Sequence, residues 1–173
     1  MHSVLRRKIS ALAICAIVAA STSLATEAWV VRTDSTGPTK VGMTLSELNS
    51  AVHEKFSMPA DKEDQGCFYV SPSSHPQISF MIEDGRLARV DVDKPGVLTA
   101  EGIQVGDSEQ RARRIYGSEM RVEPSAYGGP GDHYLTVRSH NGKYGIRFET
   151  ENGKITMFYA GSFKAIQYIE GCE

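Results

Sequence analysis

Residues 78–87 read ISFMIEDGRL, and about 68 residues later residues 146–155 read IRFETENGKI. Both stretches follow one order of residue types: Ile, Phe, an acid, a turn residue, Gly, a base and an aliphatic residue. In each, an Asp-Gly or Asn-Gly pair lies between apolar and polar residues that alternate, which is a strong signal for a β-hairpin. A match that occurs twice at this long interval indicates a duplicated small module.

A helix is expected ahead of each hairpin. Residues 41–44 read VGMT and are echoed by VGDS at residues 105–108. The final hydroxyl residue of each stretch can cap a helix, and Glu47 completes a capping box in the first. Apolar residues follow at helical spacing as far as Phe56, and Gly117 is expected to end the second helix.

The predicted fold class is α+β, with two tandem helix-plus-antiparallel-meander repeats that form one concave sheet surface. The expected boundaries are 26–40 for an N-terminal arm, 41–104 for repeat 1 and 105–173 for repeat 2. The helix of each repeat can cover one face of its sheet, which leaves the other face available. A last strand is expected at residues 165–169.

Residues 1–25 are predicted to be a signal peptide. A basic start that ends at Lys8 precedes an apolar run, residues 9–20, which is too short to span a membrane. Small residues then provide a cleavage site after Ala25. The alternative is a first core helix. We therefore expect a periplasmic or secreted protein.

Charge and hydropathy limit the partners of the exported chain. Removal of the signal takes three of the 19 basic residues and none of the 21 acidic ones, which leaves a net charge of about −5. This balance argues against nucleic acid and anionic membrane surfaces as main partners. The remaining sequence contains no stretch that could span a bilayer. A protein partner is expected, and its identity and the oligomeric state are left open.

Two cysteines remain in the exported chain, Cys67 and Cys172. An even pair in an exported protein predicts a disulfide bond. The alternative is two buried free thiols.

The sequence contains no pattern that assigns a catalytic, metal or cofactor site. The four histidines of the exported chain lack the spacing of metal ligands, and they are His53, His75, His133 and His140. The glycine-rich residues 128–131 lack the lysine and helix of a phosphate loop. No serine lies in a nucleophile-elbow pattern. The protein is therefore expected not to be an enzyme.

Three tyrosines are predicted to contact the partner: Tyr69, Tyr127 and Tyr159. Neighbours on a strand point to opposite faces, so Tyr69 and Phe68 cannot both be core, nor can Tyr159 and Phe158. Tyrosine tolerates a wet face better than phenylalanine, and Tyr127 lies on the glycine-rich loop. The alternative for each is ordinary cross-strand packing.

Each repeat resembles the helix-plus-meander module of the β-lactamase inhibitor protein (BLIP-like) family and of the BamE/SmpA-type envelope lipoproteins. The VGMTLSEL of residues 41–48 is similar to the Gly-Met-Thr-x-x-Glu-Val opening of the lipoproteins. The tandem arrangement is closer to the inhibitors, whose two modules form a concave sheet that grips a partner protein. The resemblance covers roughly residues 40–172. The chain departs from both families, because it lacks the lipid-bearing cysteine and has one expected disulfide across the repeats.

These observations predict an exported, non-enzymatic protein-binding module, such as an inhibitor or immunity protein for an envelope or secreted enzyme. The resemblance to the lipoproteins implies an alternative, an envelope assembly or maintenance factor. A hydrolytic or carbohydrate-active enzyme is a third reading, and the missing catalytic pattern counts against it.

Overall fold

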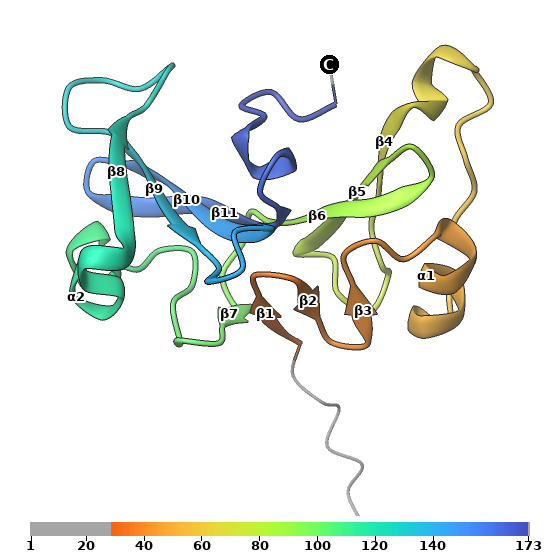
Figure 1. Cartoon of the computed structure of the whole chain (residues 1–173), viewed down its shortest axis with the longest axis horizontal. Helices are drawn as coiled ribbons and strands as arrows, with labels where there is room; N and C mark the ends of the chain where they lie inside the picture. The colour runs from red at the N-terminus through yellow and green to blue at the C-terminus, as the bar shows by residue number, and fades with distance from the viewer. Residues whose placement is uncertain (1–28, 173) are drawn as a thin grey trace, which may run out of the picture.

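The computed structural model describes residues 29–172, so the predicted signal peptide and its cleavage site lie outside the described residues. Within this range the main sheet has seven strands, each antiparallel to its neighbours (Figure 1). From one edge to the other, the strands are β4 (Cys67–Val70), β5 (Ile78–Glu83), β6 (Arg86–Val92), β11 (Lys154–Ser162), β10 (Tyr144–Glu151), β9 (His133–Arg138) and β8 (Met120–Pro124).

A second, smaller sheet is built mainly from the predicted N-terminal arm. Its strands in the described range are β3 (Thr39–Lys40), β2 (Ser35–Thr36), β1 (Val30–Arg32) and β7 (Leu98–Thr99). Strand β7 follows β6 in the chain and pairs parallel with β1. The arm is therefore joined to the rest of the fold by backbone hydrogen bonds.

The two α-helices of residues 29–172 and the small sheet lie on the same side of the main sheet (Figure 1). They are α1 (Leu45–Val52) and α2 (Glu109–Tyr116). The capping box predicted for α1 is present, because the Thr44 hydroxyl accepts from the Glu47 amide and the Glu47 carboxylate accepts from the Thr44 amide. His53 ends α1 in the left-handed conformation, with φ 56°. Helix α1 is therefore shorter than the predicted one, which reached Phe56.

The fold class predicted from the sequence is wrong. Strands dominate residues 29–172, and the α-helices of this range are two, of eight residues each. The protein is mostly β, with one seven-stranded and one four-stranded sheet, rather than an α+β tandem of helix-plus-meander repeats. The helical periodicity of the sequence led to an overestimate of the helical part of the fold. It also gave no indication that the N-terminal arm forms a sheet of its own.

Both predicted hairpins are confirmed. Asp84-Gly85 joins β5 to β6, and Asn152-Gly153 joins β10 to β11. Both residues of each turn have positive φ, at 51° and 73° in the first and 50° and 73° in the second. Two-residue turns with this geometry match the twist of the strands they connect, and Asn, Asp and Gly adopt it at the lowest cost.

The echo between residues 41–44 and 105–108 corresponds to equivalent hydrogen bonds. The Gly42 amide donates to the Leu87 carbonyl at 2.7 Å, and the Gly106 amide donates to the Ile155 carbonyl at 2.8 Å. The start of each helix is thus fixed against the first residues after a hairpin turn. The repeated residues therefore form the same backbone hydrogen bond in both halves of the chain.

The face of the main sheet that points toward the helices is the apolar core. Phe80, Phe148 and Phe158 are fully buried there, and the rings of Phe148 and Phe158 lie 5.7 Å apart across β10 and β11. Leu48 of α1 and Ala112 of α2 belong to the same cluster. Burial of this apolar area is the main driving force for folding.

The last ten residues described, 163–172, cross the opposite face of the main sheet, and we call them the C-terminal strap (Figure 1). The strand predicted at residues 165–169 is wrong, since this stretch begins with the short 3₁₀-helix η3 (Ala165–Gln167). The predicted disulfide is present between Cys172 and Cys67 of β4, with 5.3 Å between the Cα atoms. The bond ties the end of the strap to an edge strand.

Candidate functional site

The side of the main sheet that faces away from the helices is the candidate site, and we call it the concave face. Strands β8 and β4 rise on this side of the molecule, and the C-terminal strap lies between them (Figure 1). The strand register aligns six polar side chains in one row across the face: Ser79, Asp91, Tyr159, Arg147, Thr136 and Arg121. A polar row of this kind is the opposite of the apolar core on the other side.

Arg89 is the centre of the polar contacts on the concave face. Its guanidinium forms a bidentate ion pair with Asp91, at 2.7 and 2.8 Å, and donates to the Tyr69 hydroxyl at 2.7 Å. The remaining nitrogen donates to the Ala165 and Tyr168 carbonyls of the strap, at 3.0 and 2.9 Å. Arg89 and Asp91 are both buried. A buried charge pair is stable only when its hydrogen bonds are satisfied, and here the strap supplies two of them.

The C-terminal strap packs against the sheet at a position that has no side chain. Gly145 leaves room for Ile166, because a Cβ atom at this position would lie 2.6 Å from the Ile166 Cδ1. At the outer side of the strap, the Glu83 carboxylate accepts from Lys164 and from the Tyr168 hydroxyl, both at 2.9 Å. The centre of the concave face is therefore covered by the chain's own C-terminus.

Tyr159 points to the concave face, as the alternation requires, but it is only 1% exposed. The prediction that this residue is exposed is wrong, because the guanidinium of Arg89 lies 4.4 Å from the centre of its ring and adjacent groups close around it. Its hydroxyl donates to Glu149 at 3.0 Å. Burial raises the pKa of Tyr159 and also that of Glu149. Tyr159 in this arrangement is a packing residue that a partner cannot reach.

Tyr69 and Tyr127 are exposed, at 40% and 73%, as the sequence predicted. Tyr69 lies on the edge strand β4, and Tyr127 lies in the loop between β8 and β9 at the other end of the sheet. The two tyrosines are therefore not brought together. Burial of the Tyr69 hydroxyl, together with the nearby charge of Asp91, raises the pKa of Tyr69 to about 12. This phenol stays protonated at neutral pH and can donate to Asp91, which lies 3.2 Å away.

A hollow of about 250 Å³ opens on the concave face beside Tyr69. Its other lining residues are Ser79, Asp91, Asp93 and Met157. Sequence reasoning singled out the tyrosine and missed both carboxylates. Arg89, Asp91 and Asp93 occur at every second position along β6 and just beyond it, so the period of a strand already places them on one face.

Within residues 29–172, His133 is the histidine that lies beside a charged partner. Its Nδ1 lies 3.1 Å from the Glu109 carboxylate, which also accepts from the Thr150 hydroxyl at 2.8 Å. This contact joins the start of α2 to β9 and β10 on the helix side of the sheet. Residues 29–172 contain no group of three or more His, Cys, Asp or Glu side chains placed to hold a metal ion. In the same range, neither α-helix has the length and hydropathy of a membrane span.

Comparison with protein-family models, curated proteins and solved structures gives no match to this chain. The resemblances noted from the sequence therefore stay predictions, and function has to be argued from the residues themselves.

Proposed function

We propose that the protein is an exported, non-enzymatic module that binds another protein through the concave face of its main sheet. The observation that carries the proposal is the hollow between Tyr69 and Met157, which places a partly exposed aromatic ring next to two carboxylates. Its volume of about 250 Å³ is below the range of small-molecule and cofactor sites. The hollow suits a single side chain supplied by a partner.

The chemistry of the hollow favours a basic side chain. Asp91 shares its charge with Arg89, whereas Asp93 is exposed and makes no side-chain hydrogen bond or ion pair within residues 29–172. An arginine or lysine placed here would contact Asp93 with its charged end and the Tyr69 ring with its stem. Arginine and tyrosine are among the residues that dominate protein–protein binding energies. The net charge of about −5 of the exported chain would also speed the approach of a positively charged partner.

Export is supported by two independent features. The first 25 residues have the charge and hydropathy order of a signal peptide. The disulfide between Cys67 and Cys172 belongs to an oxidising compartment such as the periplasm or the exterior of the cell. An inhibitor or immunity protein for an envelope or secreted enzyme is the kind of binding protein that fits this location.

The test is capture by the immobilised exported chain, residues 26–173, from periplasmic and secreted extracts of the producing cells. Asp93→Arg reverses the charge of the hollow, and we expect it to weaken capture about 30-fold, which corresponds to ~2 kcal/mol. Glu151→Arg makes the same charge change at an exposed residue of the β10–β11 hairpin and is the matched control. Both variants should melt within a few degrees of the wild type. If the two variants capture the partner equally well, the hollow is not the binding site.

A further inference from the structure

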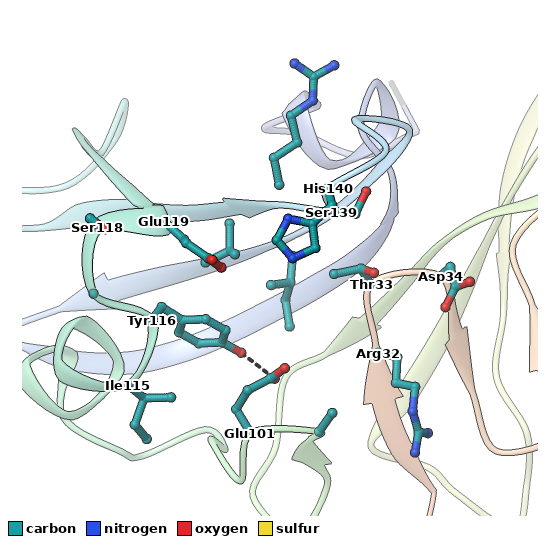
Figure 2. Close-up of a pocket in the computed structure, with 15 residues that line it drawn as sticks. Arg32, Thr33, Asp34, Glu101, Ile115, Tyr116, Ser118, Glu119, Ser139 and His140 are labelled. Atoms are coloured by element: carbon teal, nitrogen blue, oxygen red, sulfur yellow. Dashed lines mark hydrogen bonds between the residues drawn. The ribbon is translucent and has the colours of Figure 1, made fainter.

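A larger pocket, of about 680 Å³, lies on the helix side of the main sheet (Figure 2). It is bounded by the end of α2, the turn between β1 and β2, and the turn between β9 and β10. The core residues Val137 and Ile146 reach it from the sheet, and Ile115 reaches it from α2. Its volume is in the range of small-molecule sites, and its floor is apolar as such sites require. It is separate from the concave face, because it lies on the opposite side of the sheet.

Three carboxylates from separate segments surround this apolar floor: Asp34, Glu101 and Glu119 (Figure 2). Glu101 is fixed in place, because the Tyr116 hydroxyl donates to it at 2.7 Å. Tyr116 is itself held by packing against Phe148, with 5.7 Å between the ring centres. Glu119 makes no side-chain hydrogen bond or ion pair within the described range, and Figure 2 shows it directed into the pocket.

Three basic residues also line the pocket, and two of them, Arg32 and Arg138, are directed away from the space between the carboxylates. The Arg138 guanidinium donates to the Gly142 carbonyl at 2.9 Å and lies 4.0 Å from the centre of the Phe163 ring. The side chain of Arg32 points away from the space between Glu119 and Glu101 (Figure 2). The His140 ring lies over the pocket in the same view, and a neutral imidazole can accept a hydrogen bond from an ammonium group.

Residues 115–117, at the carboxyl end of α2, also line the pocket. The backbone there is already paired, because the Gly117 amide donates to the Arg113 carbonyl and the Gly117 carbonyl accepts from the Met120 amide. The acceptors directed at the apolar floor are therefore carboxylates.

We propose that this pocket binds a short aliphatic polyamine, such as a diamine or triamine. Its ammonium groups would contact the separated carboxylates of Glu101, Glu119 and Asp34, and its methylene segments would lie on Val137 and Ile146. A single compact cation cannot use the apolar floor, and a neutral apolar molecule cannot use the carboxylates. The proposal goes beyond binding of a protein partner and does not depend on it.

Isothermal titration of the exported chain, residues 26–173, with spermidine tests the proposal. We expect saturable 1:1 binding. The uncharged analogue 1,4-butanediol should give no heat of binding, and Mg²⁺ at the same concentration of charge should not displace spermidine. Absence of saturable binding up to 1 mM spermidine, or displacement by Mg²⁺ at equal charge, would overturn the proposal.

Variants assign the binding to the pocket. Glu119→Gln removes a charge from an exposed residue and should weaken spermidine binding at least tenfold. Glu151→Gln is the matched control on the β10–β11 hairpin and should leave the affinity unchanged. Asp93→Arg on the concave face should also leave the affinity for spermidine unchanged. The experiment can therefore contradict the polyamine pocket without contradicting the protein-binding site, and the reverse. Equal weakening by Glu119→Gln and Glu151→Gln would show that spermidine responds only to net charge, which contradicts a pocket.

Discussion

Phe158 and Tyr159 are neighbours on β11, and both are almost fully buried, yet their surroundings are opposite. Phe158 contacts Phe148 and the rest of the apolar core. Tyr159 lies under Arg89 and donates to Glu149. One face of the sheet is therefore buried by apolar contacts, which have no preferred direction. The other face is buried by hydrogen bonds and ion pairs, which require a particular geometry.

Because of this difference, we expect the two faces to tolerate amino-acid substitutions differently. An apolar core accepts substitutions that keep its volume, because dispersion contacts can be remade by small shifts. The polar cluster around Arg89 requires each partner, because a buried group that loses its hydrogen bond keeps its full desolvation cost. Four predictions test whether the two faces differ in this way, beginning with the largest expected effect.

Phe158→Ala should be the most destabilising single change, with a loss of about 3–5 kcal/mol in the free energy of unfolding. The reason is the cavity left beside Phe148 in the apolar core, which the surrounding side chains can close only in part. Chemical denaturation measures the loss, and Phe158→Leu is the control, which keeps most of the volume and should cost much less. A Phe158→Leu variant as unstable as Phe158→Ala would show that this face is as demanding as the polar one.

Removal of the disulfide in a Cys67→Ser/Cys172→Ser variant should cost about 2–4 kcal/mol. The two residues are 105 positions apart, so the bond restricts the unfolded chain strongly. The strap should stay in place in the folded variant, because Arg89 and Glu83 still hold it. Hydrogen exchange of the strap amides checks this, and rapid exchange under native conditions would show that the disulfide alone seats it.

Arg89→Met should cost about 2–3 kcal/mol, because Asp91 loses both hydrogen bonds of the ion pair in a buried position. Exposure of nearby Tyr69 lets water reach Asp91, which keeps the loss below that of Phe158→Ala. The double variant Arg89→Met/Asp91→Leu should recover at least half of the lost stability, as measured by denaturation. If the double variant is as unstable as the sum of Arg89→Met and Asp91→Leu alone, the two residues act independently, and the loss in Arg89→Met does not come from leaving Asp91 unpaired.

The smallest effect concerns Glu109, the buried charge on the helix side of the sheet. Burial opposes ionisation, but hydrogen bonds from Thr150, His133 and Arg113 outweigh it and hold the pKa of Glu109 below its ordinary value of 4.5. The stability supplied by this ionised group is complete above about pH 4.5 and is lost as the pH falls through the folded pKa.

Glu109→Gln should therefore lose about 1 kcal/mol at pH 7, the usual worth of a hydrogen bond, and show a flatter decline below pH 4.5 than the wild type. Urea unfolding from pH 3 to pH 7 measures both quantities, and Glu151→Gln serves as the matched control at an exposed residue. Parallel profiles for Glu109→Gln and the wild type would mean that ionisation of Glu109 does not contribute to stability.

The hairpins and the first helix cap were predictable because their causes are local. Asp84-Gly85 and Asn152-Gly153 allow positive φ at both turn positions whatever surrounds them. The Thr44 hydroxyl and the Glu47 carboxylate meet within one helical turn. The fold class was not predictable in this way, because a helical pattern says where a helix can form and not how much of the chain the strands will take.

The candidate site was predictable only in part. Alternation along the strands correctly predicted that Phe158 and Tyr159 point to opposite faces. The preference of tyrosine over phenylalanine for a wet face correctly predicted that Tyr69 is exposed. It could not show that the strap covers Tyr159, because that contact joins residues far apart in the chain. The same alternation places Asp91 and Asp93 on the face of Arg89, so both carboxylates of the hollow were predictable from the sequence.

By itself the sequence determined the turns, the helix start, the disulfide partners and the alternation of neighbouring strand residues between two faces, since all of these follow from neighbouring residues or from a count of cysteines. Only the tertiary structure decided that β6 pairs with β11 to make one sheet, that the arm adds a second sheet, and that residues 163–172 cover the polar face. These outcomes depend on contacts between distant segments, whose free energy comes from the area and the hydrogen bonds that they bury together.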